Sequence, residues 1–137
     1  MRQIATMNSG TKATAFLLVL LLASASGSSH SQPQQKPETF ASFWREFTSA
    51  IAKNDKESVA SLTQLPFYFN DKDQDRAGFV KIYNQVFTRS IRRCMARAKP
   101  MRDANDKNSY DVFCGEVIFV FGKVDGKFKF LSFGPND

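Results

Sequence analysis

The pattern of apolar and polar positions predicts helices in the first half of the folded region. Aromatic and aliphatic side chains over residues 40–51 recur three and four positions apart, which is the spacing of one helix face. Pro37–Glu38 are residue types of a first helical turn, so we expect the helix to begin there. The segment from Asn54 to Glu57 resembles a capping box, in which Glu57 reaches back to the Asn54 backbone and a second helix begins.

Two further helices are predicted after an acidic segment. Residues 70–75 are turn-like, and Asp73 or Asp75 is placed to cap the helix that follows. Apolar residues at helical spacing then predict helices over residues 79–87 and 91–98. The alternate carboxylates of the acidic segment match the start of a calcium loop, but an arginine follows where that loop needs glycine. We therefore expect no metal site there.

After a polar loop the pattern changes from helical to extended. Residues 110–121 are rich in β-branched and aromatic side chains and predict a strand, with Gly115 marking a bulge or a bend. Asp125–Gly126 is a strong hairpin signal, and residues 127–133 return with alternating polar and apolar side chains. A short strand is also predicted at residues 66–69. Helices followed by antiparallel strands predict an α+β domain, with N-terminal helices packed on one face of a curved antiparallel sheet.

The start of the chain has the pattern of an export signal. Residues 1–25 join a positive start to an uninterrupted, mostly apolar run and end in a small-x-small cleavage pattern. The run is shorter than the about 20 residues that a spanning helix needs. Residues 26–37 form a flexible polar spacer, and residues 38–137 form the predicted domain. Because no cysteine follows the cleavage point, we expect no lipid anchor and a soluble protein that is periplasmic or secreted.

Charge and cysteine content limit the kinds of partner and the disulfide bonds that we expect. The chain has 19 basic and 13 acidic residues, and removal of Arg2 and Lys12 with the signal leaves a basic excess of four. This moderate basicity is not that of a dedicated nucleic-acid binder, so we expect no nucleic-acid partner. Cys94 and Cys114 are an even pair in a chain interpreted as exported, and they predict a disulfide. Two buried, unpaired thiols are the alternative.

Four packing motifs give the chain a resemblance to a known superfamily. They are Phe40-x-x-Phe43-Trp44-x-x-Phe47, Ala50-Ile51-x-x-Asn54-Asp55 before Leu65-Pro66, Phe79-x-x-Ile82-Tyr83-x-x-Val86-Phe87, and Val124-Asp125-Gly126-Lys127-Phe128-Lys129-Phe130. Through these motifs residues 38–133 resemble the NTF2-like superfamily, which includes SnoaL-type proteins. The resemblance implies a cone-shaped α+β fold whose sheet wraps round a long helix and leaves a cavity. Members use this cavity for isomerisation, hydrolysis, ligand binding or assembly, so the fold by itself transfers no function.

Aromatic content and this resemblance together predict a binding domain. Thirteen of the 14 phenylalanines lie after the signal, where they can form a packed core or line a concavity. We expect an exported, non-enzymatic domain without a cofactor, which holds a small apolar ligand or a protein partner in a Phe-lined concavity. The predicted wall consists of Phe43, Phe47, Tyr83, Phe87, Phe119 and Phe128. A structural module that forms a homodimer through its open sheet face is a further interpretation.

A cavity enzyme is the alternative. An isomerase- or hydrolase-like site needs a carboxylate base with a pKa near neutrality and a tyrosine that donates to the developing oxyanion. Glu116 or Asp111 is the candidate base, and Tyr83 is a candidate donor. Glu116 lies two residues from Cys114, so the two share a face unless the chain bends between them. The only histidine, His30, lies in the spacer and offers no catalytic pairing.

A basic segment precedes the polar loop. Six positive charges and no acidic residue occur within 14 residues: Arg89, Arg92, Arg93, Arg97, Lys99 and Arg102. Such a cluster can hold a phosphate, a sulfated sugar or an anionic membrane surface, or it can simply be solvated. It lacks the interleaved aromatic residues on which single-stranded nucleic acid would stack.

Overall fold

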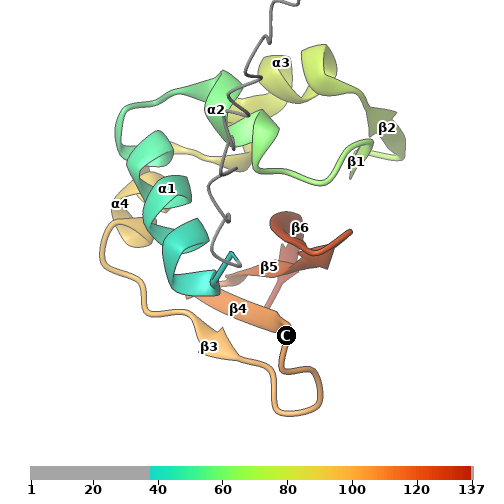
Figure 1. The fold of residues 1–137 in the computed structure, drawn as a ribbon. Helices are drawn as coiled ribbons and strands as arrows, with labels where there is room; N and C mark the ends of the chain where they lie inside the picture. Colours follow the sequence, from blue (N-terminus) through green and yellow to red (C-terminus); the bar gives the residue numbers. More distant parts are fainter. Residues whose placement is uncertain (1–37, 137) are drawn as a thin grey trace, which may run out of the picture. The chain divides into compact units, whose positions relative to one another are not determined.

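The computed structural model describes residues 38–136, so the predicted signal, the spacer and His30 lie outside the described residues. In chain order the elements are α1 (Phe40–Ala52), α2 (Lys56–Ser61), β1 (Phe67–Phe69), β2 (Lys72–Gln74), α3 (Arg76–Val86), α4 (Arg89–Met95), β3 (Met101–Arg102), β4 (Ser109–Cys114), β5 (Val117–Val124) and β6 (Lys127–Pro135). Helices combined with antiparallel sheets confirm the predicted α+β class. Figure 1 shows the helices gathered on one side of β4, β5 and β6.

α1 begins later than the sequence predicted. The side chains of Thr39 and Ser42 each accept a hydrogen bond from the other residue's backbone N–H at 3.2 Å, which forms a capping box. Phe40 is therefore the first helical residue, and the predicted start at Pro37–Glu38 was wrong. The physical reason is that the reciprocal pair satisfies free N–H groups at this helix end, whereas Glu38 bonds to the backbone of β6.

α2 is capped by the residue that follows the predicted cap. Asp55 accepts from the backbone N–H of Ser58 at 3.1 Å, whereas Asn54 has a φ of 54° just after α1. That left-handed conformation is typical of the residue that ends a helix and does not suit an N-cap. The predicted cap at Asn54 was therefore wrong. Glu57 accepts from Arg76 at 3.0 Å instead and joins α2 to α3.

The acidic segment forms a hairpin as well as a turn. β1 pairs antiparallel with β2, and the two-residue loop Asn70–Asp71 has φ values of 49° and 59°. These positive values are typical of a type I′ turn, which Asn and Asp tolerate. Asp75 then caps α3 by accepting from the backbone N–H of Gly78 at 2.7 Å, which confirms one of the two predicted caps.

The main sheet has the order β3-β4-β5-β6 and is antiparallel throughout. The prediction of one strand over residues 110–121 was wrong, because Gly115 and Glu116 form a two-residue loop between β4 and β5. Gly115 has a φ of 66°, a conformation that glycine adopts without strain. The Asp125–Gly126 hairpin is confirmed, with φ values of 50° and 79° at the loop that joins β5 to β6.

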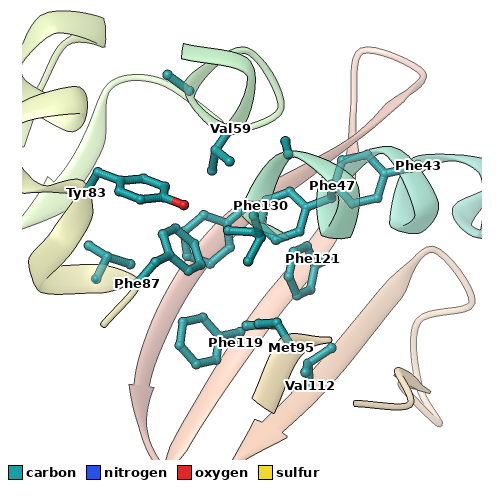
Figure 2. Close-up of a cluster of buried hydrophobic side chains, with 14 of the residues drawn as sticks. Phe43, Phe47, Val59, Tyr83, Phe87, Met95, Val112, Phe119, Phe121 and Phe130 are labelled. Atoms are coloured by element: carbon teal, nitrogen blue, oxygen red, sulfur yellow. The ribbon is translucent and has the colours of Figure 1, made fainter. Parts of the chain in front are cut away.

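Aromatic side chains from the helices and the sheet form the core of the described domain. Figure 2 shows Phe47 of α1 and Phe87 at the end of α3 beside Phe119, Phe121 and Phe130 of the sheet. The Phe47 ring centroid lies 5.1 Å from that of Phe121 and 6.0 Å from that of Phe130. Alternate positions of β5 face this core, as the pleat of a strand requires.

A disulfide joins α4 to the sheet. The sulfur atoms of Cys94 and Cys114 lie 2.07 Å apart, which is the predicted pairing. Cys114 is 6% exposed in the core cluster, whereas Cys94 is half-buried. The bridge links residues 20 positions apart and fastens α4 to the end of β4.

The sheet face opposite the helices carries two exposed apolar side chains. Phe113 of β4 is 41% exposed, because its neighbours Val112 and Cys114 take the buried face. Met101 of β3 pairs with Asp111 and is 61% exposed. Exposed apolar side chains of this kind are compatible with an interaction surface, and the homodimer through this face stays a prediction.

The hydroxyl of Tyr83 is buried, and it has no hydrogen-bond partner among the described residues. Figure 2 shows this hydroxyl directed into the core. Burial raises the pKa of Tyr83, while the positive charge of Arg92 acts in the opposite direction. A buried hydroxyl without a partner costs about 1–3 kcal/mol. We therefore expect removal of the Tyr83 hydroxyl to stabilise the fold.

We expect Tyr83→Phe to raise the free energy of unfolding by about 1 kcal/mol in urea denaturation, because the substitution removes only the unpartnered hydroxyl. Tyr68→Phe is the control, since the exposed Tyr68 hydroxyl donates to Asp71 at 3.1 Å. We expect this control to change stability by less than about 0.5 kcal/mol. A clear loss of stability in Tyr83→Phe would contradict the assignment of an unpartnered hydroxyl.

Candidate functional site

Most residues predicted to line a ligand cavity belong to the packed core. Five of the six are fully buried and pack against other aromatic rings: Phe43, Phe47, Tyr83, Phe87 and Phe119. The sixth, Phe128, lines a groove on the surface of the described domain. The candidate site is therefore this groove, and the other predicted wall residues contribute to it only by supporting the fold.

The groove lies between the start of α1, the β3–β4 loop and the β5–β6 hairpin, and we call it the α1 groove. Its volume of about 590 Å³ falls within the range of roughly 300–1,000 Å³ that is typical of small-molecule sites. Its aromatic lining consists of Phe40, Trp44, Tyr110 and Phe128. Its basic lining consists of Arg102, Lys107 and Lys123.

Stacked rings form the apolar wall of the α1 groove. The ring planes of Phe40 and Tyr110 are nearly parallel, at 4°, and their centroids lie 3.6 Å apart. Phe128 meets both rings edge-on, with its centroid 5.3 Å from that of Phe40 and 5.9 Å from that of Tyr110. Because the three rings pack on one another, they form a rigid apolar wall.

Two basic side chains lie over these rings. Arg102 donates from Nε and Nη2 to the Tyr110 hydroxyl at 3.2 and 3.0 Å, and its guanidinium carbon lies 5.5 Å from the centroid of that ring. The Nζ atom of Lys123 lies 5.1 Å from the Phe128 centroid. Lys107 adds a third positive charge from the β3–β4 loop. None of these three cations forms an ion pair with a carboxylate in the described part of the chain.

The groove depends on a contact between segments far apart in the sequence. Glu38 Oε2 accepts a hydrogen bond from the backbone N–H of Phe128 at 2.8 Å, across 90 positions. On the opposite side, Asp103 Oδ1 accepts from the backbone N–H groups of Asn105 and Asp106 and so fixes the β3–β4 loop. Glu38 is the one acidic residue among the groove's described lining, so the three basic side chains outnumber it.

The residues predicted for acid–base catalysis do not meet. The charged groups that shift the pKa of Tyr83 are Arg92 and Asp55, neither of which is a candidate base. Glu116 is exposed in the β4–β5 loop, because the bend at Gly115 breaks the alternation that would have put it on the buried face. No described carboxylate reaches the Tyr83 hydroxyl, so the predicted catalytic pair does not form.

Asp111 lies on the face of β4 opposite the core. It is half-buried, and this burial raises the pKa of its carboxyl, with the negative charge of Asp103 acting in the same direction. The folded state therefore binds this proton more tightly than the unfolded state does. As the pH rises above about 3.9, where an unfolded aspartate loses its proton, the fold loses stability until the folded carboxyl also ionises.

We expect Asp111→Asn to raise the free energy of unfolding at about pH 7 and to change it little at about pH 3, where both states are protonated. Urea denaturation at the two pH values measures the difference. The wild type measured at both pH values is the reference, so that each difference belongs to the substitution alone. An equal effect of Asp111→Asn at both pH values would rule out the charge as its cause.

The four arginines of the predicted anion-binding patch have different surroundings in the fold. Arg92 is half-buried and donates to the backbone oxygen of Phe87 at the end of α3, so it stabilises a helix terminus. Arg89, Arg93 and Arg97 are exposed. Of these, Arg93 and Arg97 border a second hollow of about 290 Å³.

Comparison with known proteins gives no match: no protein-family model, no curated protein and no solved structure matches the chain. Within residues 38–136, no helix is long and apolar enough to cross a membrane. In the same residues, no three side chains of the metal-ligating types come together. The site is therefore interpreted from its own geometry.

Sequence reasoning did not identify several residues of the α1 groove. Trp44 lies within the apolar face predicted for residues 40–51, and Lys107 and Lys123 lie in segments without a functional motif. The available signal was the pair Phe40 and Trp44, two large rings one turn apart at a helix start. That signal does not say which distant strand completes the site.

Proposed function

We propose that the protein is a binding domain that holds an amphiphilic organic anion in the α1 groove. Such a ligand has a planar or aliphatic apolar body and a carboxylate, sulfonate or phosphate group. The observation that carries the proposal is a preformed stack of rings bordered by three cations without ion-pair partners among the described residues. The apolar body packs on the aromatic wall, and the anionic group meets the cations at its border.

Charge favours an anionic ligand over a purely apolar one. A purely apolar ligand would remove water from the basic groups without giving them a partner, which is unfavourable. An anionic group instead accepts charge-assisted hydrogen bonds from Lys123 or Lys107. Arg102 has five N–H donors and spends two of them on Tyr110, so it positions that ring and keeps donors for the ligand.

The lining of the groove favours binding over catalysis. A general base must lie within hydrogen-bond reach of the proton that it removes. Glu38 is the acidic residue of the described lining, and its carboxylate already accepts from the Phe128 backbone. The groove therefore offers cations and rings for recognition, and we propose no catalytic role for it.

We also propose that the domain is a member of the NTF2-like superfamily that functions after export. The superfamily proposal is supported by the packing motifs and by helices gathered on one side of an antiparallel sheet. The export proposal is supported by the pattern of residues 1–25, which lie outside the described residues, and by the Cys94–Cys114 disulfide. Disulfides persist mainly in oxidising compartments.

The anion proposal is tested with the fluorescent probe 1-anilinonaphthalene-8-sulfonate. We expect Lys123→Gln to weaken binding of the probe about tenfold, because it removes one charge-assisted contact. Lys127→Gln is the matched control, since Lys127 is an exposed lysine on the same hairpin and does not line the groove. We expect this control to leave the affinity within about twofold of the wild type.

Two outcomes would contradict the site assignment. Equal affinity in both variants and the wild type would show that the probe binds elsewhere. Equal weakening in both variants would show that only net charge matters. Competition gives a second readout: dodecanoate is expected to displace the probe, whereas dodecylamine, a cation of the same chain length, is not.

A further inference from the structure

The two cysteines of the Cys94–Cys114 disulfide differ in exposure. Cys114 is 6% exposed within the core cluster, whereas Cys94 is half-buried and borders the hollow of about 290 Å³. A thiolate must reach one of the two sulfur atoms to exchange with a disulfide. Access therefore selects Cys94 as the residue that reacts.

Two arginines border the same hollow. Arg93 precedes Cys94 on α4 and Arg97 follows it just after the helix, and both side chains are exposed. Neither forms an ion pair within residues 38–136. The more exposed cysteine of the disulfide thus borders a hollow that two positive charges also border, and these charges raise the local concentration of small anions.

We propose that Cys94 is a site of reversible S-thiolation by anionic low-molecular-weight thiols, which carry a carboxylate or a sulfonate that Arg93 and Arg97 attract. The attacking thiolate sulfur forms a bond to Cys94 Sγ, and the bond between Cys94 and Cys114 breaks. Its electron pair goes to Cys114 Sγ, which takes up a proton in place of the one that the attacking thiol released. The small thiol is oxidised to a mixed disulfide and Cys114 is reduced, so the step needs no other oxidant.

The exchange is reversible because α4 keeps other contacts with the domain. Met95 of α4 is 1% exposed in the core, and Arg92 bonds the Phe87 carbonyl at the end of α3. Cys114 therefore stays close to Cys94 after the bridge opens, and its thiolate attacks the mixed disulfide and expels the small thiol. The ratio of free thiol to its disulfide sets the direction. None of these steps depends on the α1 groove.

The test compares 2-mercaptoethanesulfonate with cysteamine, two thiols of equal chain length and opposite charge. Each rate constant of exchange with the full chain is divided by the same thiol's rate constant with 2-hydroxyethyl disulfide, which cancels intrinsic reactivity. We expect a preference of about tenfold for the sulfonate at about 0.01 M salt. This preference is expected to fall towards one at about 1 M salt, where the screening length is about 3 Å.

Substitutions locate the source of this preference. Arg93→Gln and Arg97→Gln are each expected to reduce it about threefold, whereas Arg89→Gln removes an equal charge from the same helix outside the hollow and leaves it unchanged. After trapping by alkylation, mass spectrometry is expected to find the sulfonate thiol on Cys94 and the alkyl group on Cys114. An adduct on Cys114, no adduct at all, or the same preference in every variant overturns the proposal. Circular dichroism checks that each variant is folded.

Discussion

Phe130→Ala is expected to lower the free energy of unfolding by about 4 kcal/mol. Phe130 is fully buried in the core. Its backbone N–H donates to the Leu62 carbonyl, and its carbonyl accepts from the Gln64 N–H, so it joins β6 to the segment after α2. Its ring packs against five others: Phe47, Phe67, Phe87, Phe119 and Phe121. These rings come from α1, β1, the end of α3 and β5, so no single element can move to fill the cavity. Urea denaturation followed by circular dichroism measures the loss.

A phenylalanine on the other sheet face provides the control. Phe113→Ala removes a ring that is 41% exposed, and we expect it to cost less than about 1 kcal/mol. Phe130→Leu fills most of the cavity and is expected to fall between the two alanine variants. Similar losses in Phe130→Ala and Phe113→Ala would mean that the aromatic core does not hold the domain together in the way described.

Removing the disulfide is expected to lower the free energy of unfolding by about 3 kcal/mol. The bridge joins residues 20 positions apart and restricts the unfolded chain, which regains that freedom in Cys94→Ala/Cys114→Ala. Alanine is the appropriate replacement because Cys114 is buried, where a serine hydroxyl would need a hydrogen-bond partner. Denaturation of wild type and double variant under oxidising conditions measures the effect.

Reductant provides an independent check on the same quantity. A reducing agent is expected to lower the stability of the wild type to about that of the double variant and to leave the variant unchanged. A wild-type protein that is insensitive to reductant while its thiols become alkylated would show that the bridge adds no stability. In that case thiol exchange at Cys94 would remain a valid proposal, although the disulfide would not stabilise the fold.

Locally encoded features of the fold could be predicted from the sequence. The stripe of α1, the Asp125–Gly126 hairpin and the Asp75 cap follow from spacing and residue type within a few positions. The cap of α2 could not be placed correctly, because Asn54 and Asp55 are both good capping residues. Only the path of the chain out of α1 shows that Asn54 takes the left-handed conformation.

The sheet shows a second limit of local patterns. Residues 110–121 have one continuous strand-like composition, and Gly115 indicated a bulge or a bend, whereas the chain reverses there. The reversal depends on pairing between β4 and β5, which a single strand's composition does not contain. This difference moved Glu116 from an expected inward position to an exposed loop.

The candidate site could not be located from the sequence for a related reason. Core rings and groove rings have the same residue type, so composition does not separate Phe47 from Phe40. The stack of Phe40 on Tyr110 and the bond from Phe128 to Glu38 join positions that lie far apart along the chain. Such contacts depend on how α1 packs against the sheet, which local residue preferences do not specify.

Trp44 is an intrinsic fluorescence probe of the α1 groove. It is the only tryptophan in the chain, it is half-buried in the groove lining, and its ring centroid lies 5.5 Å from that of Phe121. Indole emission changes in intensity and wavelength when its surroundings change from water to an apolar contact. If the proposed ligand binds in the α1 groove, we expect a change in the emission of the unlabelled wild-type protein, without a competing signal from another tryptophan.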